Sequence, residues 1–519
     1  MHRSAFGVLC AALFAPSLFA AVSCESLTSL TLPQATIDSA KVVAAGEFLP
    51  PNLRARDAED PARVDNARNA VYKTVPTFCR ITMTLRPSSD SNIQVELWLP
   101  AAGWNRKYQA VGNGGWAGVI SYSALAEGVK RGYATSSTDT GHVGATGAFA
   151  LGHPEKLIDF GYRSVHEMVL KSKAVVNAFY GEAAVHSYWN GCSTGGRQGL
   201  MEAQRYPDDF DGMLAGAPAN PRSGLTTEEM VIGLAALKDP ASHIPKSKYS
   251  MIHQAVLEKC DAMDGLKDGL IQEPMKCKFE PKSLECKGAD APDCLTAPQV
   301  AALKSIYDPV FDPNTGALIY PGQSPGAETG LQVMAGGPEP FKPSLDQFRY
   351  VVHKDPNWDW RTFDLAKDGP ANEKLSEGLL NASDPNLKPF LSHAKLILYH
   401  GWSDPNVPSE NTVNYYEKVL DMAGGHAKTD GSMRLYMVPG MGHCSNGEGP
   451  NTFDMLSALE QWVESGKAPQ AVVATKYNKN GDTTSGVART RPLCPYPQVA
   501  KYKGSGSIDE AANFSCASD

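Results

Sequence analysis

Hydrophobic and polar positions alternate in short runs over two parts of the chain, from about residue 80 to residue 220 and again from residue 394. Runs rich in valine, leucine and aromatic residues predict strands, and runs with apolar positions at helical spacing predict helices. The first part reads as strand or strand and loop at 93–100, 108–118, 132–142, 184–190 and 210–219, with helices at 166–181 and 196–207. This alternation predicts a mostly parallel sheet with helices on both faces.

The regular pattern stops after Asn220, where a long region rich in proline, glycine, aspartate and cysteine begins. It resumes only at 394–405, so we expect residues 222–392 to form an inserted domain above one end of the sheet. The main domain would then comprise residues 22–221 and 393–519. The length agrees with two domains, because a chain of 519 residues is too long for one ordinary core.

Composition and charge narrow the class of protein. The chain is 42% hydrophobic and 20% charged, which is typical of a soluble globular protein. Its formal net charge of -8 gives no reason to propose nucleic acid or an anionic membrane as a partner. Residues 1–21 have the early positive charge, short apolar run and small residues of a secretion signal, and no later segment approaches the length of a membrane span. We expect a secreted or periplasmic protein.

Cysteine usage agrees with export. The chain has 11 cysteines, of which Cys10 lies in the signal, and an even number in an exported protein favours disulfides over metal-binding thiols. Cys260 with Cys277, Cys286 with Cys294, and Cys494 with Cys516 are natural local pairs, although spacing alone does not determine connectivity. The residues expected to be oxidised are Cys24, Cys79, Cys192, Cys260, Cys277, Cys286, Cys294, Cys444, Cys494 and Cys516.

The segment GCSTG at 191–195 has the G-x-S-x-G form of a turn that presents a nucleophilic serine, Ser193, between a strand and a helix. A serine hydroxyl needs a base to take its proton, and the base needs an acid to orient it. Two later strands run into loops that carry these groups, Asp404 and His443. The chain order of serine, aspartate and histidine is that of an α/β-hydrolase.

When the serine attacks an ester carbonyl, the oxygen becomes an oxyanion that backbone N–H groups must stabilise. We expect one from the N–H of Thr194 and the other from the glycine loop at 112–118, with Gly115 the best single residue. A plain flexible turn is the alternative for that loop.

Several other signals are discounted. The segment GNGGWAG is not a dinucleotide-binding pattern and opens no clear helix. The segment HEMVL resembles the start of a zinc-protease helix, but Leu170 stands where the second histidine is required, so His166 is expected to be a packed helix residue. His142 could shape the site wall, although a structural histidine is the simpler reading.

The segment CDAMDGLKDGLI carries Asp261, Asp264 and Asp268 between glycines. Three converging carboxylates repel one another unless a cation neutralises them, and hard oxygen ligands favour calcium. A solvated acidic loop is the alternative, and spacing alone does not separate the two.

The chain resembles the tannase and feruloyl esterase family from about Cys24 to Cys516. The resemblance rests on FGYRSVHEM, GCSTGGRQG, CDAMDGLKDG, LYHGWSDP, VPGMGHC and RTRPLCPYP. It implies an α/β-hydrolase core with a lid, a triad of Ser193, Asp404 and His443, and a disulfide from Cys192 to Cys444. It also implies a structural calcium ion held by Asp261, Asp264 and Asp268 with the carbonyls of Leu266 and Leu270.

The resemblance is weakest in the lid, where substrate is chosen. It implies hydrolysis of small aromatic esters, free or attached to plant polysaccharide or polyphenol. We rank a feruloyl-type ester first, a galloyl ester second and a terephthalate monoester third. Phe348, Trp358 and Trp360 could stack on an aromatic acid or form the core of the lid. An alternative of another class is an exported binding protein that keeps a hydrolase fold without catalysis.

Overall fold

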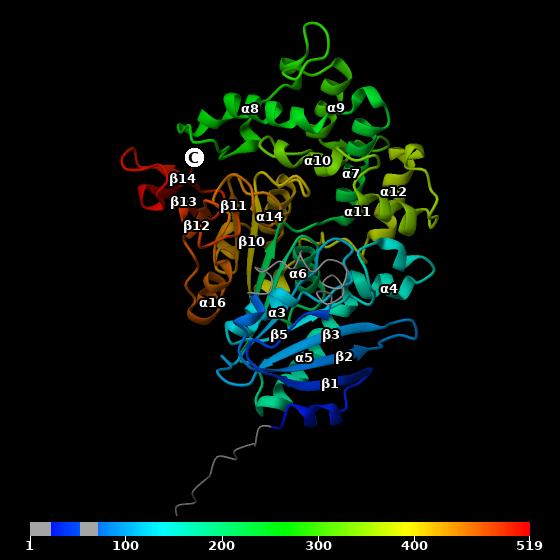
Figure 1. Ribbon diagram of the computed structural model, residues 1–519, viewed down its shortest axis with the longest axis vertical. Coiled ribbons are helices and arrows are strands. Elements are labelled where there is room, and N and C mark those ends of the chain that lie inside the picture. Colours follow the sequence, from blue (N-terminus) through cyan, green and yellow to red (C-terminus); the bar gives the residue numbers. More distant parts are fainter. Residues whose placement is uncertain (1–21, 52–70, 519) are drawn as a thin grey trace, which may run out of the picture.

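Figure 1 shows the computed structural model, which describes residues 22–51 and 71–518. The expected secretion signal, residues 1–21, lies outside the described residues. Among the residues described, no helix is both long and apolar enough to cross a membrane.

A nine-stranded sheet forms the centre of the molecule, in the order β1-β2-β3-β5-β4-β6-β7-β10-β11. The first three strands and the pairing of β3 with β5 are antiparallel, and every pairing from β5 to β11 is parallel. The strands are β1 (Ala35–Val43), β2 (Phe78–Leu85), β3 (Ile93–Pro100), β4 (Lys107–Val111), β5 (Ala134–Thr138), β6 (His186–Cys192), β7 (Gly212–Gly216), β10 (Lys395–Gly401) and β11 (Met433–Val438).

Helices cover both faces of this sheet, as the alternating pattern predicted. Both faces need cover because successive side chains of a buried strand such as β10 point to opposite faces of the sheet and are apolar. Leu396 and Leu398 pack in the cluster that includes α5, α6 and α14, whereas Ile397 and Tyr399 pack with α16 on the other face. The helices of the main domain are α3 (Tyr122–Lys130), α4 (Pro154–Ile158), α5 (Ser164–Tyr180), α6 (Thr194–Arg205), α14 (Glu410–Ala423), α15 (His426–Thr429) and α16 (Met455–Ser465).

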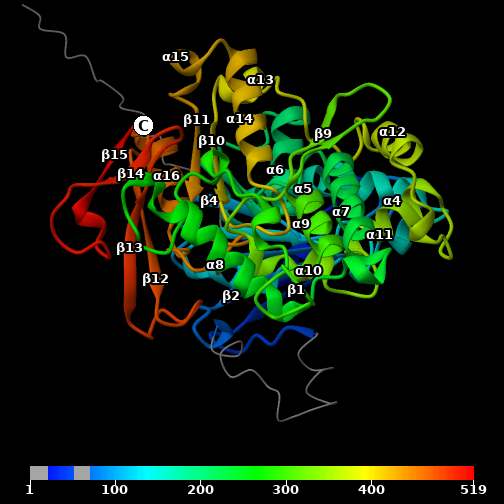
Figure 2. The same cartoon turned by 90° about the horizontal axis from the view of Figure 1, so that it is seen from above.

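The segment between β7 and β10 forms a layer above the carboxyl ends of the parallel strands (Figures 1 and 2). Since β7 and β10 pair directly with each other, this whole segment leaves and returns at one point of the sheet. Its elements are α7 (Arg222–Leu237), α8 (Tyr249–Cys260), α9 (Ala297–Tyr307), β8 (Val310–Phe311), β9 (Leu318–Tyr320), α10 (Gln332–Ala335), α11 (Lys342–Asp346), α12 (Leu365–Ser376) and α13 (Lys388–Leu391).

The aromatic residues singled out in the insertion form its core. Phe348 and Trp360 are almost fully buried, and Phe348 packs against Trp358 and Phe363. The structure therefore supports the interpretation of these rings as core residues of the insertion.

The chain ends in two antiparallel hairpins beside the sheet, β12 (Val472–Tyr477) with β13 (Val487–Leu493), and β14 (Val499–Tyr502) with β15 (Phe514–Ala517). The three predicted local disulfides are confirmed. The five disulfides of the described residues are Cys24–Cys79, Cys192–Cys444, Cys260–Cys277, Cys286–Cys294 and Cys494–Cys516.

Candidate active site

Ser193 occupies the sharp turn between β6 and α6. Its φ of 64° is a strained value for a residue with a side chain. The flanking glycines permit this turn, because a Cβ on Gly191 would lie 2.6 Å from the carbonyl oxygen of Gly195. A Cβ on Gly112 would lie 2.5 Å from the Cα of Gly195. The glycine loop after β4 therefore packs directly on the serine turn.

Asp404 and His443 come from the loops that follow β10 and β11, two adjacent strands. Nδ1 of His443 lies 2.7 Å from Oδ2 of Asp404, and the side chain of Asp404 is fully buried. The other oxygen, Oδ1, accepts hydrogen bonds from the backbone N–H groups of Asn406 (2.8 Å) and Val407 (3.0 Å). The carboxylate is thus fixed in one orientation, and within the described parts of the chain Nε2 of His443 has no hydrogen-bond partner.

The charges of this pair reinforce each other. Burial alone would raise the pKa of Asp404, but His443 and His400 outweigh it and hold that pKa well below its ordinary value. Burial likewise opposes protonation of His443, but the charge and hydrogen bond of Asp404 outweigh it and raise the pKa of His443 above its ordinary value. The pair can therefore stabilise positive charge on the imidazole ring.

His400 is a part of the site to which the sequence analysis gave no role. It is fully buried at the end of β10, and its Nε2 lies 3.0 Å from both Oδ2 of Asp404 and the carbonyl oxygen of Val407. Its Nδ1 lies 2.7 Å from the hydroxyl of Thr412 on α14. The signal available in the sequence was a histidine four residues before the aspartate, but a buried strand histidine has no distinctive pattern.

A cavity of about 390 Å³ joins these elements. Ser193 and His443 both line it, and so do Gly115 and Thr194. The residues next to the serine and the histidine are bonded to each other by the Cys192–Cys444 disulfide, whose Cα atoms are 6.0 Å apart. The covalent link holds the two loops together at the cavity wall.

The two residues expected to supply oxyanion donors contact each other. The hydroxyl of Thr194 donates to the carbonyl oxygen of Gly115 at 3.0 Å, and Gly115 has a φ of 54°. Next to it, Trp116 is anchored from both sides. Its carbonyl lies 2.8 Å from Nε2 of His142, and its indole N–H donates to the carbonyl of Pro343 in the insertion at 2.9 Å.

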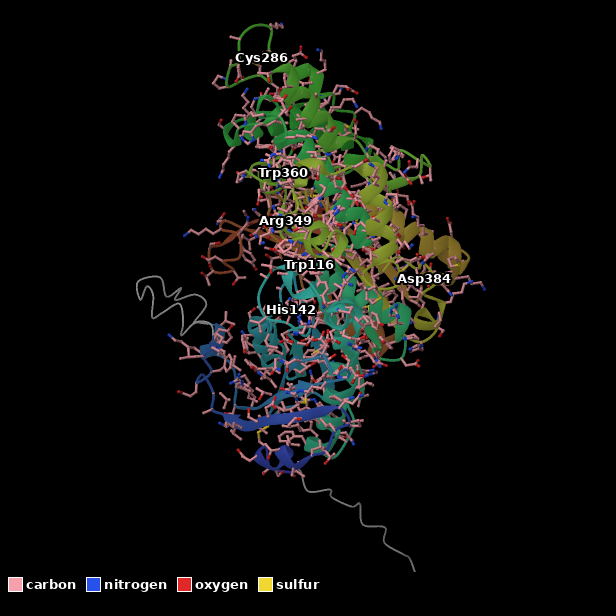
Figure 3. The ribbon with its side chains drawn as sticks, turned by 90° about the vertical axis from the view of Figure 1, so that its right-hand side faces the viewer. Trp116, His142, Cys286, Arg349, Trp360 and Asp384 are labelled. Carbon is pink, nitrogen blue, oxygen red and sulfur yellow. A yellow bond between two sulfur atoms is a disulfide. The ribbon has the colours of Figure 1, made fainter. Side chains whose placement is uncertain are left out.

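His142 is a structural residue, buried and stacked on Phe149 with ring centroids 3.7 Å apart. Burial lowers its pKa, so it supports the loop as a neutral ring. Figure 3 shows Trp116 at the boundary of the two domains, with His142 on the sheet side and Arg349 and Trp360 within the insertion.

The acidic loop of residues 261–270 joins the insertion to the C-terminal hairpin. Backbone N–H groups of the loop donate to Asp261 and Asp264, and Asp268 pairs with Arg491 on β13 at 2.6 Å. Burial, together with the charges of Asp268 and Asp261, raises the pKa of Asp264. This donor chemistry fits a hard divalent cation, although Arg491 already neutralises one of the three carboxylates.

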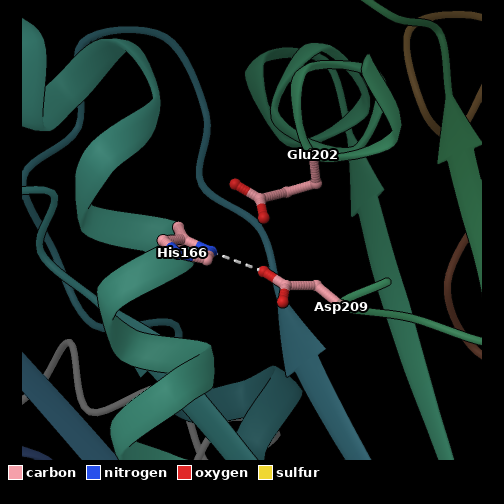
Figure 4. Close-up of side chains that lie close together, drawn as sticks. All are labelled: His166, Glu202 and Asp209. Carbon is pink, nitrogen blue, oxygen red and sulfur yellow. Dashed lines mark hydrogen bonds and ion pairs between the residues drawn. The ribbon is translucent and has the colours of Figure 1, made fainter. Parts of the chain in front are cut away.

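His166 belongs to a second cluster, with Glu202 near the C-terminal end of α6 and Asp209 in the loop before β7 (Figure 4). Among the described residues, His166, Glu202 and Asp209 have ligand-type atoms that all lie within 4.8 Å of one another. His166 is hydrogen-bonded to Asp209 at 2.7 Å and stacked on Tyr206. Burial and the charge of Asp209 raise the pKa of Glu202 well above its ordinary value. The expectation of a simple packed residue at 166 was therefore incomplete, because this histidine helps to join α5 to the loop before β7.

Comparison with known proteins supplies a family and close structural neighbours. The family model described as tannase and feruloyl esterase matches residues 79–517. The chain is 37% identical to an uncharacterized esterase of Xanthomonas campestris, over 96% of this chain and 91% of that protein. It is 33% identical to a probable feruloyl esterase B-2 of Aspergillus terreus, over 95% of this chain and 94% of that protein.

The solved structures agree in fold. The crystal structure of feruloyl esterase B from Aspergillus oryzae superposes with a TM-score of 0.87 at 30% identity, covering 95% of this chain and 99% of that one. A tannin acyl hydrolase from Aspergillus niger superposes with a TM-score of 0.74 at 23% identity, covering 95% and 93%. The sheet order and its helices are those of an α/β-hydrolase, as the order of the three predicted residues indicated.

Proposed function

The chain belongs to the tannase and feruloyl esterase family and is a carboxylic ester hydrolase, and we propose that it acts on esters of hydroxylated aromatic acids through an acyl-enzyme on Ser193. Feruloyl-type esters are the first candidates and galloyl esters the second, since the matching family is described as tannase and feruloyl esterase. A terephthalate monoester is the third. The observation that carries the proposal is the buried Asp404–His443 hydrogen bond at the wall of the cavity that Ser193 also lines.

The reaction follows from the roles of these groups. Nε2 of His443 takes the proton of the Ser193 hydroxyl as the oxygen attacks the ester carbonyl, and Asp404 stabilises the imidazolium that forms. The N–H groups of Thr194 and Gly115 donate to the oxyanion. His443 then gives its proton to the leaving alcohol, and water repeats the sequence to release the acid.

The insertion, residues 222–392, serves in this proposal as a lid that selects the substrate. Its contribution to the cavity wall includes Arg222, Leu225, Phe341 and Pro343. The three apolar side chains among these suit an aromatic ring. Phe341 is the aromatic residue of the insertion that can stack on the substrate ring. The sequence analysis considered Phe348, Trp358 and Trp360 for that role, but they pack inside the insertion.

The acidic loop would bind a structural calcium ion. Asp261, Asp264 and Asp268 would hold it together with the backbone carbonyls of Leu266 and Leu270. The ion would supply positive charge between the three carboxylates and link the lid to the C-terminal hairpin. It would take no part in the ester chemistry, because this loop lies in the insertion and not at a strand end of the sheet.

Export is also part of the proposal. Five disulfides join ten of the described cysteines, and such bonds persist in oxidising compartments. A secreted or periplasmic enzyme would meet plant-derived esters there.

A fluorophosphonate probe and a Ser193→Ala variant test the serine mechanism. We expect the probe to label Ser193 in the native chain. The variant should fold normally and lose several orders of magnitude in turnover of methyl ferulate. Ser445→Ala, in the loop of His443 but outside the cavity lining, is the matched control and should keep its rate.

More than a few per cent of native turnover in Ser193→Ala would refute the triad. An unlabelled protein without turnover would favour the alternative of a binding protein on a hydrolase fold. A rate panel of methyl ferulate, methyl gallate, the terephthalate monoester and a short p-nitrophenyl ester then ranks the substrates.

A further inference from the structure

Two ionisable side chains line the active-site cavity without being used by the proposed mechanism. Arg222 begins α7, the first helix of the insertion, and Glu229 follows it by seven residues. Two turns of helix separate them, so both face the same side of α7. Each is only 3% exposed. Charged residues are rarely buried to this extent without a partner.

Arg222 is held rigidly but leaves part of its guanidinium unused. The guanidinium carbon lies 3.9 Å from the ring centroid of Trp116, which is the cation–π geometry. Its Nε donates to the side-chain oxygen of Gln347 at 3.2 Å. Its Nη2 is buried and has no hydrogen-bond partner among the described residues. Burial lowers the pKa of Arg222 to about 10, which leaves it protonated at neutral pH.

Glu229 offers a complementary group. Its Oε2 is buried and also lacks a partner among the described residues. Burial, followed by the charge of Glu228, raises the pKa of Glu229 well above its ordinary value. Whether ionised or protonated, this carboxyl can accept a hydrogen bond from a hydroxyl group.

Unsatisfied buried polar groups are costly, and in a ligand cavity they are most simply explained as partners reserved for the ligand. A group that satisfies both side chains must accept from Arg222 and donate to Glu229. A hydroxyl does both, whereas a methyl ether cannot donate and a carboxylate can only accept.

We propose that Arg222 and Glu229 form the subsite that recognises a phenolic hydroxyl on the acyl part of the ester. This inference rests on the proposed function, which places the aromatic acid in this cavity. The apolar walls at Leu225 and Phe341 hold the ring, and the two polar side chains read its substituent. Arg222 and Glu229 therefore determine specificity and do not act on the scissile bond.

Matched substrates test the inference on the native protein, with no change to the chain. Methyl ferulate is compared with methyl 3,4-dimethoxycinnamate, and methyl gallate with methyl 3,4,5-trimethoxybenzoate. We expect at least one hydroxylated ester to exceed its methylated partner by about 10- to 100-fold in kcat/KM, because the ether leaves Glu229 unpaired. Monomethyl terephthalate, which places a carboxylate on the ring, should be slower than the hydroxylated ester.

Variants of the two residues locate the effect. Arg222→Met and Glu229→Leu remove the polar groups, and each should reduce the preference for hydroxyl over methyl ether to within about threefold. Arg222→Lys and Glu229→Gln keep a donor and an acceptor, and should restore part of it. Glu328→Gln is the matched control. It changes another buried carboxyl of the insertion, which pairs with His253 and does not line the cavity, and the native preference should persist.

The outcomes separate this inference from the proposed function. Hydrolysis of p-nitrophenyl acetate that depends on Ser193, combined with equal rates on hydroxylated and methylated esters, would overturn the subsite alone. A higher rate on monomethyl terephthalate, lost in Arg222→Met, would replace the hydroxyl with a carboxylate and also overturn it. Absence of any hydrolysis that depends on Ser193 would instead overturn the proposed function. If Arg222→Met fails to fold, the substrate ratios of the native protein and the variants Glu229→Leu and Glu229→Gln still test the subsite.

Discussion

Removing the Cys192–Cys444 disulfide tests how the serine and the histidine are held in register. The perturbation is the double variant Cys192→Ala, Cys444→Ala. The bond closes a loop with a sequence separation of 252 residues. The chain-entropy model converts that length to roughly 5 kcal/mol of stability. The variant should therefore melt at a lower temperature.

The larger effect is expected on turnover. The bond lies beside both Ser193 and His443 and fixes two loops that are far apart in the sequence. A misplacement of about 1 Å in such a site can cost roughly 100-fold in rate. We therefore expect kcat to fall by about 10- to 100-fold on methyl ferulate when it is measured well below the melting temperature.

The control is Cys286→Ala with Cys294→Ala, which removes a disulfide of sequence separation 8 in the insertion. The same model gives roughly 2.5 kcal/mol for this loop, and kcat should not change. Native kcat in the Cys192 and Cys444 variant, measured on folded protein, would refute the positioning role. Peptide mapping without reduction provides a direct check. A free Cys192 thiol, or another partner for it, would contradict the structure itself.

The pairing of His443, the hydrogen bonds of His400 and the acidic loop can each be tested separately. Activity should rise with pH, because His443 must be neutral to act as the base. The raised pKa of His443 places the midpoint of this rise in kcat/KM above the ordinary imidazole value of about 6.5. A midpoint at or below that value would contradict the pairing with Asp404. His400→Leu should lower kcat by about tenfold with little change in KM, since Asp404 loses a hydrogen-bond donor. A lower melting temperature with native kcat would limit the role of His400 to packing. Chelation of calcium should lower the melting temperature, because the folded protein loses the stability that the bound ion adds, and it should leave the initial rates of the folded enzyme unchanged. The melting temperature of Asp261→Asn should respond little to the chelator. Immediate, reversible loss of rate without unfolding would place the ion in the mechanism.

Local patterns carried much of the information about the fold. The predicted strands at 93–100 and within 394–405 are found as β3 and β10. In β10, burial on both faces demands continuous apolar residues over a short length. The serine turn was visible because its geometry requires small residues at fixed offsets, as Gly191 and Gly195 show. Short-range disulfides such as Cys260–Cys277 could be proposed for the same reason, since few residues separate the partners.

Other features could not be found without the folded chain. His400 stands four residues before Asp404, but nothing in the sequence distinguishes a buried strand histidine that bonds to this carboxylate from one that only packs. The aromatic residues of the insertion illustrate the same limit. The composition of 222–392 does not say which rings face the lid core and which face the cavity, and the structure assigns Phe348 to the first and Phe341 to the second.

The sequence by itself determined the strand and helix alternation, the sharp turn at Ser193 and the two loops that carry Asp404 and His443, because each depends on residues close together in the chain. The tertiary structure alone decided what meets across the cavity. Arg222 lies over Trp116 there, and their partnership depends on how the insertion returns to the sheet. Such contacts join segments whose spacing in sequence is arbitrary, so their specificity resides in packing, burial and charge that exist only after folding.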